Sequence, residues 1–234
     1  MSTAFFRYLG WLCRAPRPVW QSRTVAGLTL LMVLGWSVAA SGQHTKVHQF
    51  HRADLPPGVV GRGQLIRETI PPYHHQPVEI QLPKGAEVSL ANGGMFEPPE
   101  AAPLKVGMMI GQVYRLRVTN IPFSPGQEVY PTVEVINRLC PPPGREWRYP
   151  IPLQITREEL LMAVQGQYIV RVVYLEDPKA ALPQREDPQQ QRYFDVGPAE
   201  DPLQTADQLG RPMAIIRLGS RTPDVDPGTG IFTF

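Results

Sequence analysis

The sequence predicts a mainly β protein, an antiparallel β-sandwich with one short helix. Three observations support this fold class. Apolar and polar residues alternate in several short stretches, which is typical of strands with one buried face. Turn clusters rich in glycine and proline separate these stretches at the spacing of a sandwich. The 27 prolines in a chain of 234 residues leave little room for long helices.

A leader precedes the predicted sandwich. Residues 25–40 form an apolar run that follows four arginines and no acidic residue, and the small polar residues 41–43 come next. This is the order of a secretory signal, and the run is shorter than the roughly 20 residues of a membrane-spanning helix. We therefore expect residues 1–42 to be a cleaved signal peptide. An uncleaved signal anchor is the alternative, and the long basic region also fits a later start of translation.

The leader determines the expected location and charge of the protein. We expect an exported protein (periplasmic, cell-surface or secreted), or a single-pass signal-anchored membrane protein if the leader is retained. Without residues 1–42 the chain has 19 Lys and Arg against 21 Asp and Glu, so its formal net charge is −2. This balance, without a basic run, lacks the electrostatic footprint of a nucleic-acid-binding protein, so we expect no nucleic acid partner.

Residues 43–76 predict an extended arm, because they hold all five histidines and several prolines with no sustained apolar period. Residues 77–218 hold the predicted sandwich. Its clearest strand patterns, with apolar residues two positions apart, lie at 77–83, 113–118, 130–136 and 214–218.

One segment has a helical pattern instead. Thr156 and Glu159 have the spacing of a capping box, in which the Thr156 hydroxyl accepts from the Glu159 backbone and the Glu159 carboxylate reaches back. Apolar residues follow at helical spacing, and Gly166 can adopt the left-handed conformation that ends a helix. We expect a helix over residues 157–164, followed by a strand over residues 167–175.

The sequence around this helix resembles the tyrosine corner of immunoglobulin-like and fibronectin type III-like β-sandwiches. The matching features are the short helix, then Gly166-x-Tyr168, then an apolar strand. The resemblance implies a buried Tyr168 ring whose hydroxyl bonds a backbone group in or just before the helix, so that Tyr168→Phe costs about 1–3 kcal/mol. The chain after the leader lacks the cysteine pair of antibody domains, so the resemblance is to a generic immunoglobulin-like sandwich and carries no function.

Two further segments depart from the strand pattern. Residues 178–209 are rich in proline and glutamine, and they predict a long irregular surface loop. Residues 219–234 predict a flexible C-terminal tail. Cys140 is the one cysteine after the leader, and we interpret it as a small apolar residue at a strand end, with a thiol for intermolecular pairing as the alternative.

The histidines are the strongest candidates for chemistry. His44, His48 and His51 are spaced by four and then three residues, and imidazole is a common ligand of zinc, copper and nickel. Cleavage after Ser41 would also make His44 the third residue, where the amine, two deprotonated amides and the imidazole suit square-planar Cu(II) or Ni(II). The alternative interpretation is a solvated arm, and we predict no resident cofactor.

The predicted function is that of an exported, non-catalytic, envelope-associated binding or structural module. No histidine follows His75, and the chain has no GxSxG motif or glycine-rich phosphate loop, so nucleophilic catalysis has little support. We expect a protein partner in the envelope or outside the cell, and a membrane contact only if the leader is retained. The candidate contact surfaces are the loop 178–209 and a sheet face with Arg115, Arg117 and Arg171.

Two other functions remain as alternatives at this point. One is a periplasmic metal-binding protein that uses the arm with His44, His48 and His51. The other is a hydrolase or lyase with carboxylate chemistry, which would need a cleft lined by acids of raised pKa.

Overall fold

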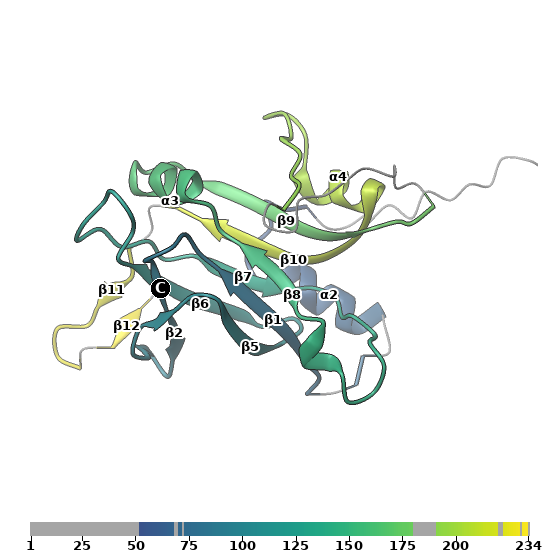
Figure 1. Cartoon of the computed structure of the whole chain (residues 1–234), viewed down its shortest axis with the longest axis horizontal. Helices are drawn as coiled ribbons and strands as arrows, with labels where there is room; N and C mark the ends of the chain where they lie inside the picture. Colours follow the sequence, from purple (N-terminus) through teal and green to yellow (C-terminus); the bar gives the residue numbers. More distant parts are fainter. Residues whose placement is uncertain are drawn as a thin grey trace, which may run out of the picture. The chain divides into compact units, whose positions relative to one another are not determined.

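The computed structural model describes residues 52–67, 70–71, 73–179, 191–219, 222–229 and 231–233. All of them belong to one compact unit, Thr45–Phe234. This part of the chain is mainly β, with its longer strands in two sheets and with three α-helices (Figure 1). The mainly β class predicted from the sequence is confirmed.

The larger sheet has the strand order β3-β2-β6-β7-β10-β9, and β4 also pairs with β2. Each of these pairs is antiparallel. The strands are β2 (Glu87–Asn92), β3 (Met95–Phe96), β4 (Glu100–Ala101), β6 (Val113–Thr119), β7 (Thr132–Val135), β9 (Ile169–Glu176) and β10 (Gly210–Leu218).

The smaller sheet has the order β5-β1-β8. In it β1 (His75–Gln81) runs antiparallel to β5 (Leu104–Met109) and parallel to β8 (Ile151–Gln154). A separate pair of two-residue strands, β11 (Asp224–Val225) and β12 (Phe232–Thr233), lies near the C-terminus.

The main hydrophobic core takes side chains from both sheets. Ile80 and Leu153 come from the smaller sheet, and Leu116, Val118 and Ile216 come from the larger one, and all five are fully buried. Burial of such side chains is the dominant favourable contribution to folding. The alternation predicted for residues 113–118 therefore has the expected result, with Leu116 and Val118 facing the core.

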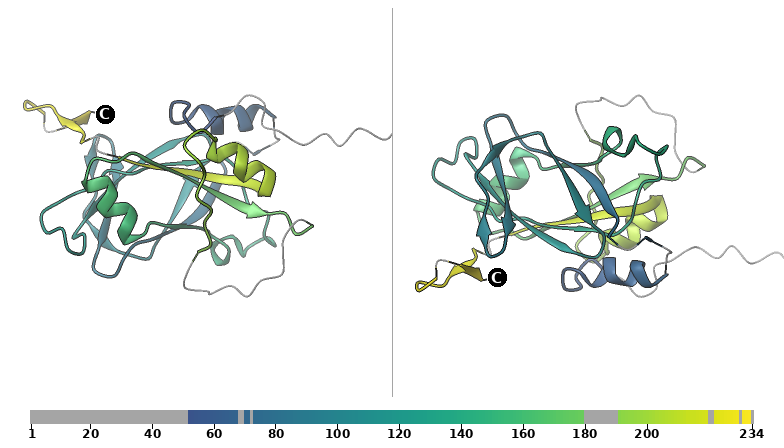
Figure 2. Two further views of the ribbon diagram at one scale, coloured as in Figure 1. Left: turned by 90° about the horizontal axis from the view of Figure 1, so that it is seen from above. Right: turned by 90° about the horizontal axis from the view of Figure 1, so that it is seen from below.

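A second, smaller core lies on the other face of the larger sheet. There α2 (Val59–Arg67) and α4 (Pro202–Leu209) contribute Val60 and Leu203, which pack with Ile215 of β10. The two views in Figure 2 show α2 and α4 together at one end of the sheet, away from α3 (Arg157–Val164). A short 3-10 helix, η2 (Glu146–Arg148), precedes β8. The helices thus cover only part of this face.

A buried ion pair holds the segment before α2 against the sheet. Arg217 Nη1 of β10 lies 3.0 Å from Glu134 Oε2 of β7, and the two side chains are 4% and 0% exposed. The arm adds hydrogen bonds to both side chains: the Leu55 carbonyl accepts from Arg217 at 3.3 Å, and the Gly61 N–H donates to Glu134 Oε1 at 2.8 Å. Nε of Arg217 is buried without a partner among the described residues. The arm also donates from its Ala53 N–H to the Asp201 carboxylate at 3.0 Å.

The prediction of an extended arm over residues 43–76 is therefore wrong for the part that the structure describes. Residues 52–67 turn into a helix and pack on the sheet. The sequence did not predict this helix because α2 reads VVGRGQLIR, with two glycines and no clear apolar period. Tertiary contacts determine the structure of this segment: Val60 packs in the smaller core, and the Gly61 N–H donates to Glu134.

The tyrosine-corner prediction is also wrong. Tyr168 is 66% exposed, and its hydroxyl has no hydrogen bond to any residue that the structure describes. Ile169, the first residue of β9, packs against the main core, so strand alternation turns the preceding Tyr168 the other way. We consequently expect Tyr168→Phe to leave the stability unchanged.

The other two irregular segments contain regular structure as well. In the predicted loop 178–209, Asp201 caps α4 by accepting from the Leu203 N–H, and Pro202 takes the first helical position. In the predicted flexible tail 219–234, Ile231 packs directly against Gly94 in the turn between β2 and β3. Both segments hold contacts that a propensity argument does not detect.

Candidate functional site

Alternate residues of β2, β6 and β7 bring polar side chains to the part of the sheet face that the helices leave uncovered. Ser89 of β2 pairs with Arg117 of β6, and Arg115 pairs with Thr132 of β7. The residues between the two arginines and after them point into the main core instead. We call the surface formed by Phe96, Arg115, Arg117 and Tyr130 the arginine face.

Aromatic rings surround Arg117. Its guanidinium carbon lies 5.2 Å from the centre of the Phe96 ring, which is within the range of a cation–π contact. The Phe96 and Tyr130 rings are themselves 5.7 Å apart. The Tyr130 hydroxyl donates to Glu128, and burial together with this hydrogen bond raises the pKa of Tyr130 to about 12. Tyr130 is therefore a neutral phenol at physiological pH.

Several polar groups under the arginine face have no partner among the described residues. These are the Ser89 and Thr119 hydroxyls and Nε of Arg117, and all three atoms are buried. A buried polar group without a hydrogen bond costs about 1–3 kcal/mol. In addition, no described carboxylate lies within ion-pair distance of Arg117. Arg117 thus carries a positive charge that no described carboxylate pairs, and its Nε is a buried donor without a partner among the described residues.

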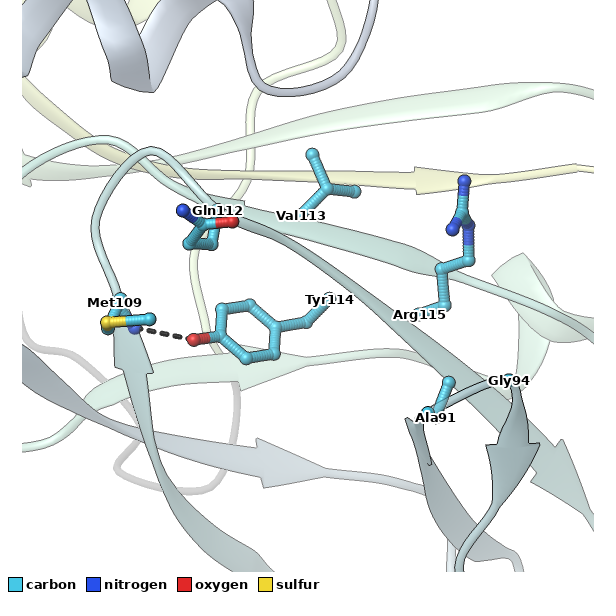
Figure 3. A pocket seen from close by; sticks show the side chains of 8 residues that line it. Ala91, Gly94, Met109, Gln112, Val113, Tyr114 and Arg115 are labelled. Atoms are coloured by element: carbon cyan, nitrogen blue, oxygen red, sulfur yellow. Dashed lines mark hydrogen bonds between the residues drawn. The ribbon is translucent and has the colours of Figure 1, made fainter.

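A pocket of about 490 Å³ opens beside Arg115 (Figure 3). In Figure 3 the Tyr114 ring points toward Met109, whose backbone N–H donates to the Tyr114 hydroxyl at 2.8 Å, and Arg115 points the opposite way from the same strand. Burial lowers the pKa of Arg115, but an arginine stays charged in proteins. The lining residues are Ala91, Gly93, Gly94, Met109, Gln112, Val113, Tyr114 and Arg115.

The turn between β2 and β3 shapes one wall of this pocket. Gly93 and Gly94 have φ angles of +59° and +85°, a conformation that the tight turns of β-hairpins require. Beside Gly93 the wall is backbone with open space in front of it, whereas the Ile231 side chain packs against Gly94. The pocket can accept a flat or extended group beside the Arg115 guanidinium.

Arg171, which the sequence placed on the same face, belongs elsewhere. Its guanidinium bonds both carboxylate oxygens of Glu159 and the Gln154 carbonyl, and the Arg171 and Glu159 side chains are only 13% and 15% exposed. Glu159 also completes the predicted capping box with Thr156, which is confirmed, and Gly166 ends the helix with a φ of +88°. Arg171 is thus a structural residue.

The histidine prediction is not tested by the structure. His44, His48 and His51 lie outside the described residues. Within the described ranges no three His, Cys, Asp or Glu side chains group closely enough to hold a metal ion. His74 is half-buried, with its Nε2 unpartnered among those residues, and its pKa is lowered by burial first and then by Arg138 and His75. Cys140 is an exposed free thiol.

Sequence reasoning missed the aromatic members of the arginine face and the Glu134–Arg217 pair. Phe96 sits in a two-residue strand that no periodicity can reveal, and Tyr130 precedes its strand. Glu134 and Arg217 are 83 residues apart, so nothing local signals that they meet. The alternation of Arg115 and Arg117 with apolar residues was the available signal.

The structure defines a class of protein: a mainly β, two-sheet protein with an uncovered face that carries two arginines, two aromatic rings and a pocket. None of its described helices is long and apolar enough to cross a membrane. No model of a protein family, no curated protein and no solved structure matches the chain.

Proposed function

We propose that the protein is an exported, non-catalytic binding module that takes an anionic segment of an envelope or extracellular protein on its arginine face. The observation that carries the proposal is the state of Arg117. Its guanidinium lies over the Phe96 ring beside Tyr130, has no carboxylate partner among the described residues, and has buried unpartnered hydroxyls next to it.

The composition of the face supports a protein partner. Arginine and tyrosine are enriched among the residues that contribute most to protein–protein binding, and they act at well-packed positions. A carboxylate fits a guanidinium through two parallel hydrogen bonds, which are stronger than bonds between neutral groups. Arg117 suits a carboxylate of an extended acidic segment, and Arg115 adds a second positive charge two positions away on the same strand, ~7 Å along its axis.

Export of the protein and an immunoglobulin-like sandwich fold are also part of this proposal. Export rests on the leader, residues 1–42, and its alternative is a retained signal anchor. An immunoglobulin-like sandwich is supported by the two sheets and their short strands. The exposed Tyr168 and the parallel β1–β8 pair weigh against that finer assignment.

The test uses hexaglutamate as a defined probe and compares two charge-matched double variants. Arg115→Gln with Arg117→Gln removes both charges of the arginine face. Arg145→Gln with Arg148→Gln removes two exposed arginines near η2 and gives the same net charge. We expect the first variant to bind the peptide at least about tenfold more weakly than the parent, and the second to bind within about twofold of it.

Amide chemical shifts during the peptide titration locate the site. We expect the shifts to concentrate in β2, β6 and the turn at Gly93 and Gly94. Equal weakening by both double variants would show a nonspecific charge effect and would contradict the proposal, as would shifts confined to another surface. Tight binding of heparin without any binding of the peptide would assign the face to an acidic polysaccharide instead.

A further inference from the structure

The helix α2 has two different faces. Val60, Gly61 and Gln64 are buried against the sheet. Val59, Arg62 and Ile66, at positions i, i+3 and i+7, share the opposite face of the helix and are exposed, and Ile66 is 87% exposed. A large aliphatic side chain at this exposure is not explained by the fold of the unit itself.

The charged residues within α2 are both arginines. The helix contains Arg62 and Arg67 and no acidic residue. Leu65, next to Ile66, is also exposed. We call Val59, Arg62, Leu65, Ile66 and Arg67 the α2 patch. Exposed aliphatic side chains beside arginines suit the surface of an anionic membrane, where the cations meet the headgroup phosphates and the aliphatic side chains enter the headgroup layer.

The position of α2 in the chain points to the same partner. The apolar run of the leader ends at Ala40. Ala53 is the first described point of the arm that is hydrogen-bonded to the rest of the unit, through Asp201 at the start of α4 and Arg217 of β10. The twelve residues between these points span at most ~43 Å when fully extended. A retained leader would therefore hold α2 within reach of the bilayer, and a signal cleaved at the membrane releases the chain beside it.

We propose that the α2 patch is a membrane-contact surface that rests on an anionic bilayer with Ile66 inserted among the lipid headgroups. This inference is independent of the arginine face, which lies on a different part of the molecule. If α2 contacts the membrane, the unit Thr45–Phe234 is oriented with residues 52–67 toward the lipid. The arginine face can then meet a protein partner while the unit stays on the membrane.

The experiment uses residues 45–234, which form a compact unit with its own core and lack the apolar leader. The probes are phosphatidylcholine vesicles and vesicles in which about one quarter of the lipid is phosphatidylglycerol. We expect sedimentation with the anionic vesicles, and a reduction of about tenfold in the partition coefficient for Ile66→Ser. Phe123→Ser removes an apolar side chain that is 82% exposed elsewhere, and it is the matched control.

A depth measurement separates insertion from loose attraction. Trp147 is the one tryptophan in residues 45–234, so Ile66→Trp combined with Trp147→Phe places a single reporter in the α2 patch. We expect its fluorescence to shift to shorter wavelength with anionic vesicles. No sedimentation, equal binding of Ile66→Ser and the parent, or an unshifted reporter would each overturn the proposal, and a reporter that shifts on adding a protein extract but not vesicles would assign the patch to a protein groove.

Discussion

The same sheet face holds arginines in two opposite settings. Over β7 and β10, Arg217 is buried, paired with Glu134, and bonded to the Leu55 carbonyl of the arm. Over β2 and β6, Arg117 lies among aromatic rings with no carboxylate partner and with buried hydroxyls unpartnered beside it, within the described part of the chain. In one half of the face, which we call the closed half, the arginine has a carboxylate partner within the protein. In the other, the open half, the described residues provide none.

This difference distinguishes structural charge from available charge. A buried ion pair is costly to break, because removal of one partner leaves the other charge buried and alone, and its paired groups are not available to a ligand. A half-buried guanidinium without a counter-charge contributes little to stability, and it binds an anion without first losing an internal partner. We therefore expect substitutions in the closed half to change stability, and substitutions in the open half to change binding.

The largest effect is expected for Glu134→Ala. The variant leaves Arg217 buried without a counter-charge and removes the acceptor of the Gly61 N–H, so the free energy of unfolding should fall by about 3–5 kcal/mol. Urea denaturation measures this loss. The double variant Glu134→Leu with Arg217→Met should be less destabilised than Glu134→Ala. A loss below about 1 kcal/mol for Glu134→Ala would remove the distinction drawn between the two halves.

The next effect concerns the fit of α2 on the sheet. A Cβ on Gly61 would lie 2.7 Å from Gly111 Cα and 2.9 Å from Gly111 N, and these are backbone atoms that cannot turn aside. We expect Gly61→Ala to cost about 1–3 kcal/mol, although alanine ordinarily favours a helix. Thermal unfolding shows whether Gly61→Ala lowers the stability, as we expect, or raises it. Gly197→Ala, where the nearest atom is 3.9 Å away, is the control and should be neutral.

A direct comparison of two arginines sharpens the argument. Arg171→Gln breaks charged hydrogen bonds to Glu159 and should lower the free energy of unfolding by about 1–3 kcal/mol. Arg117→Gln should lower it by less than about 1 kcal/mol, because the variant loses the cation–π contact with Phe96 but no ion pair. Both are measured by urea unfolding under one set of conditions. Similar losses for the two variants would place Arg117 among the structural residues.

The smallest effect is a pH dependence from His74. Burial, Arg138 and His75 lower its pKa in the folded protein below the ordinary value of 6.5. Above pH 6.5 both states carry a neutral ring, whereas below it the unfolded chain takes up the proton first, so stability falls as the pH falls. His74→Gln should therefore lose less stability than the parent between neutral and mildly acidic pH. Parallel pH profiles would contradict this.

The parts of the structure that the sequence could predict are those encoded locally. The capping box of Thr156 and Glu159 lies within four residues, and the alternation of Leu116 and Val118 with the arginines marks two faces of one strand. Such patterns depend on backbone geometry alone, so they survive without knowledge of the partners.

The remaining features depend on distant contacts. Arg217 bonds the carbonyl of Ala53 across 164 positions, and alternation alone shows it only as a polar residue in a strand. Arg171 was expected on an exposed face, but it shares the strand side of Val173, which packs in the main core, and α3 supplies its counter-charge. The site was predicted only in part for the same reason, because Phe96 reaches Arg117 through tertiary packing.

The hydrogen bonds from Asp201 and Arg217 to Ala53 have a consequence for the order in which the chain can fold. During synthesis Ala53 is made early, but Asp201 and Arg217 follow 148 and 164 residues later. Until then the arm lacks these hydrogen-bond partners. Contacts between residues so far apart in the sequence form slowly. The arm can therefore reach its final position only after α4 and β10 are in place, so these contacts form among the last in folding. Completion of the fold and fixation of its first described residues become one event.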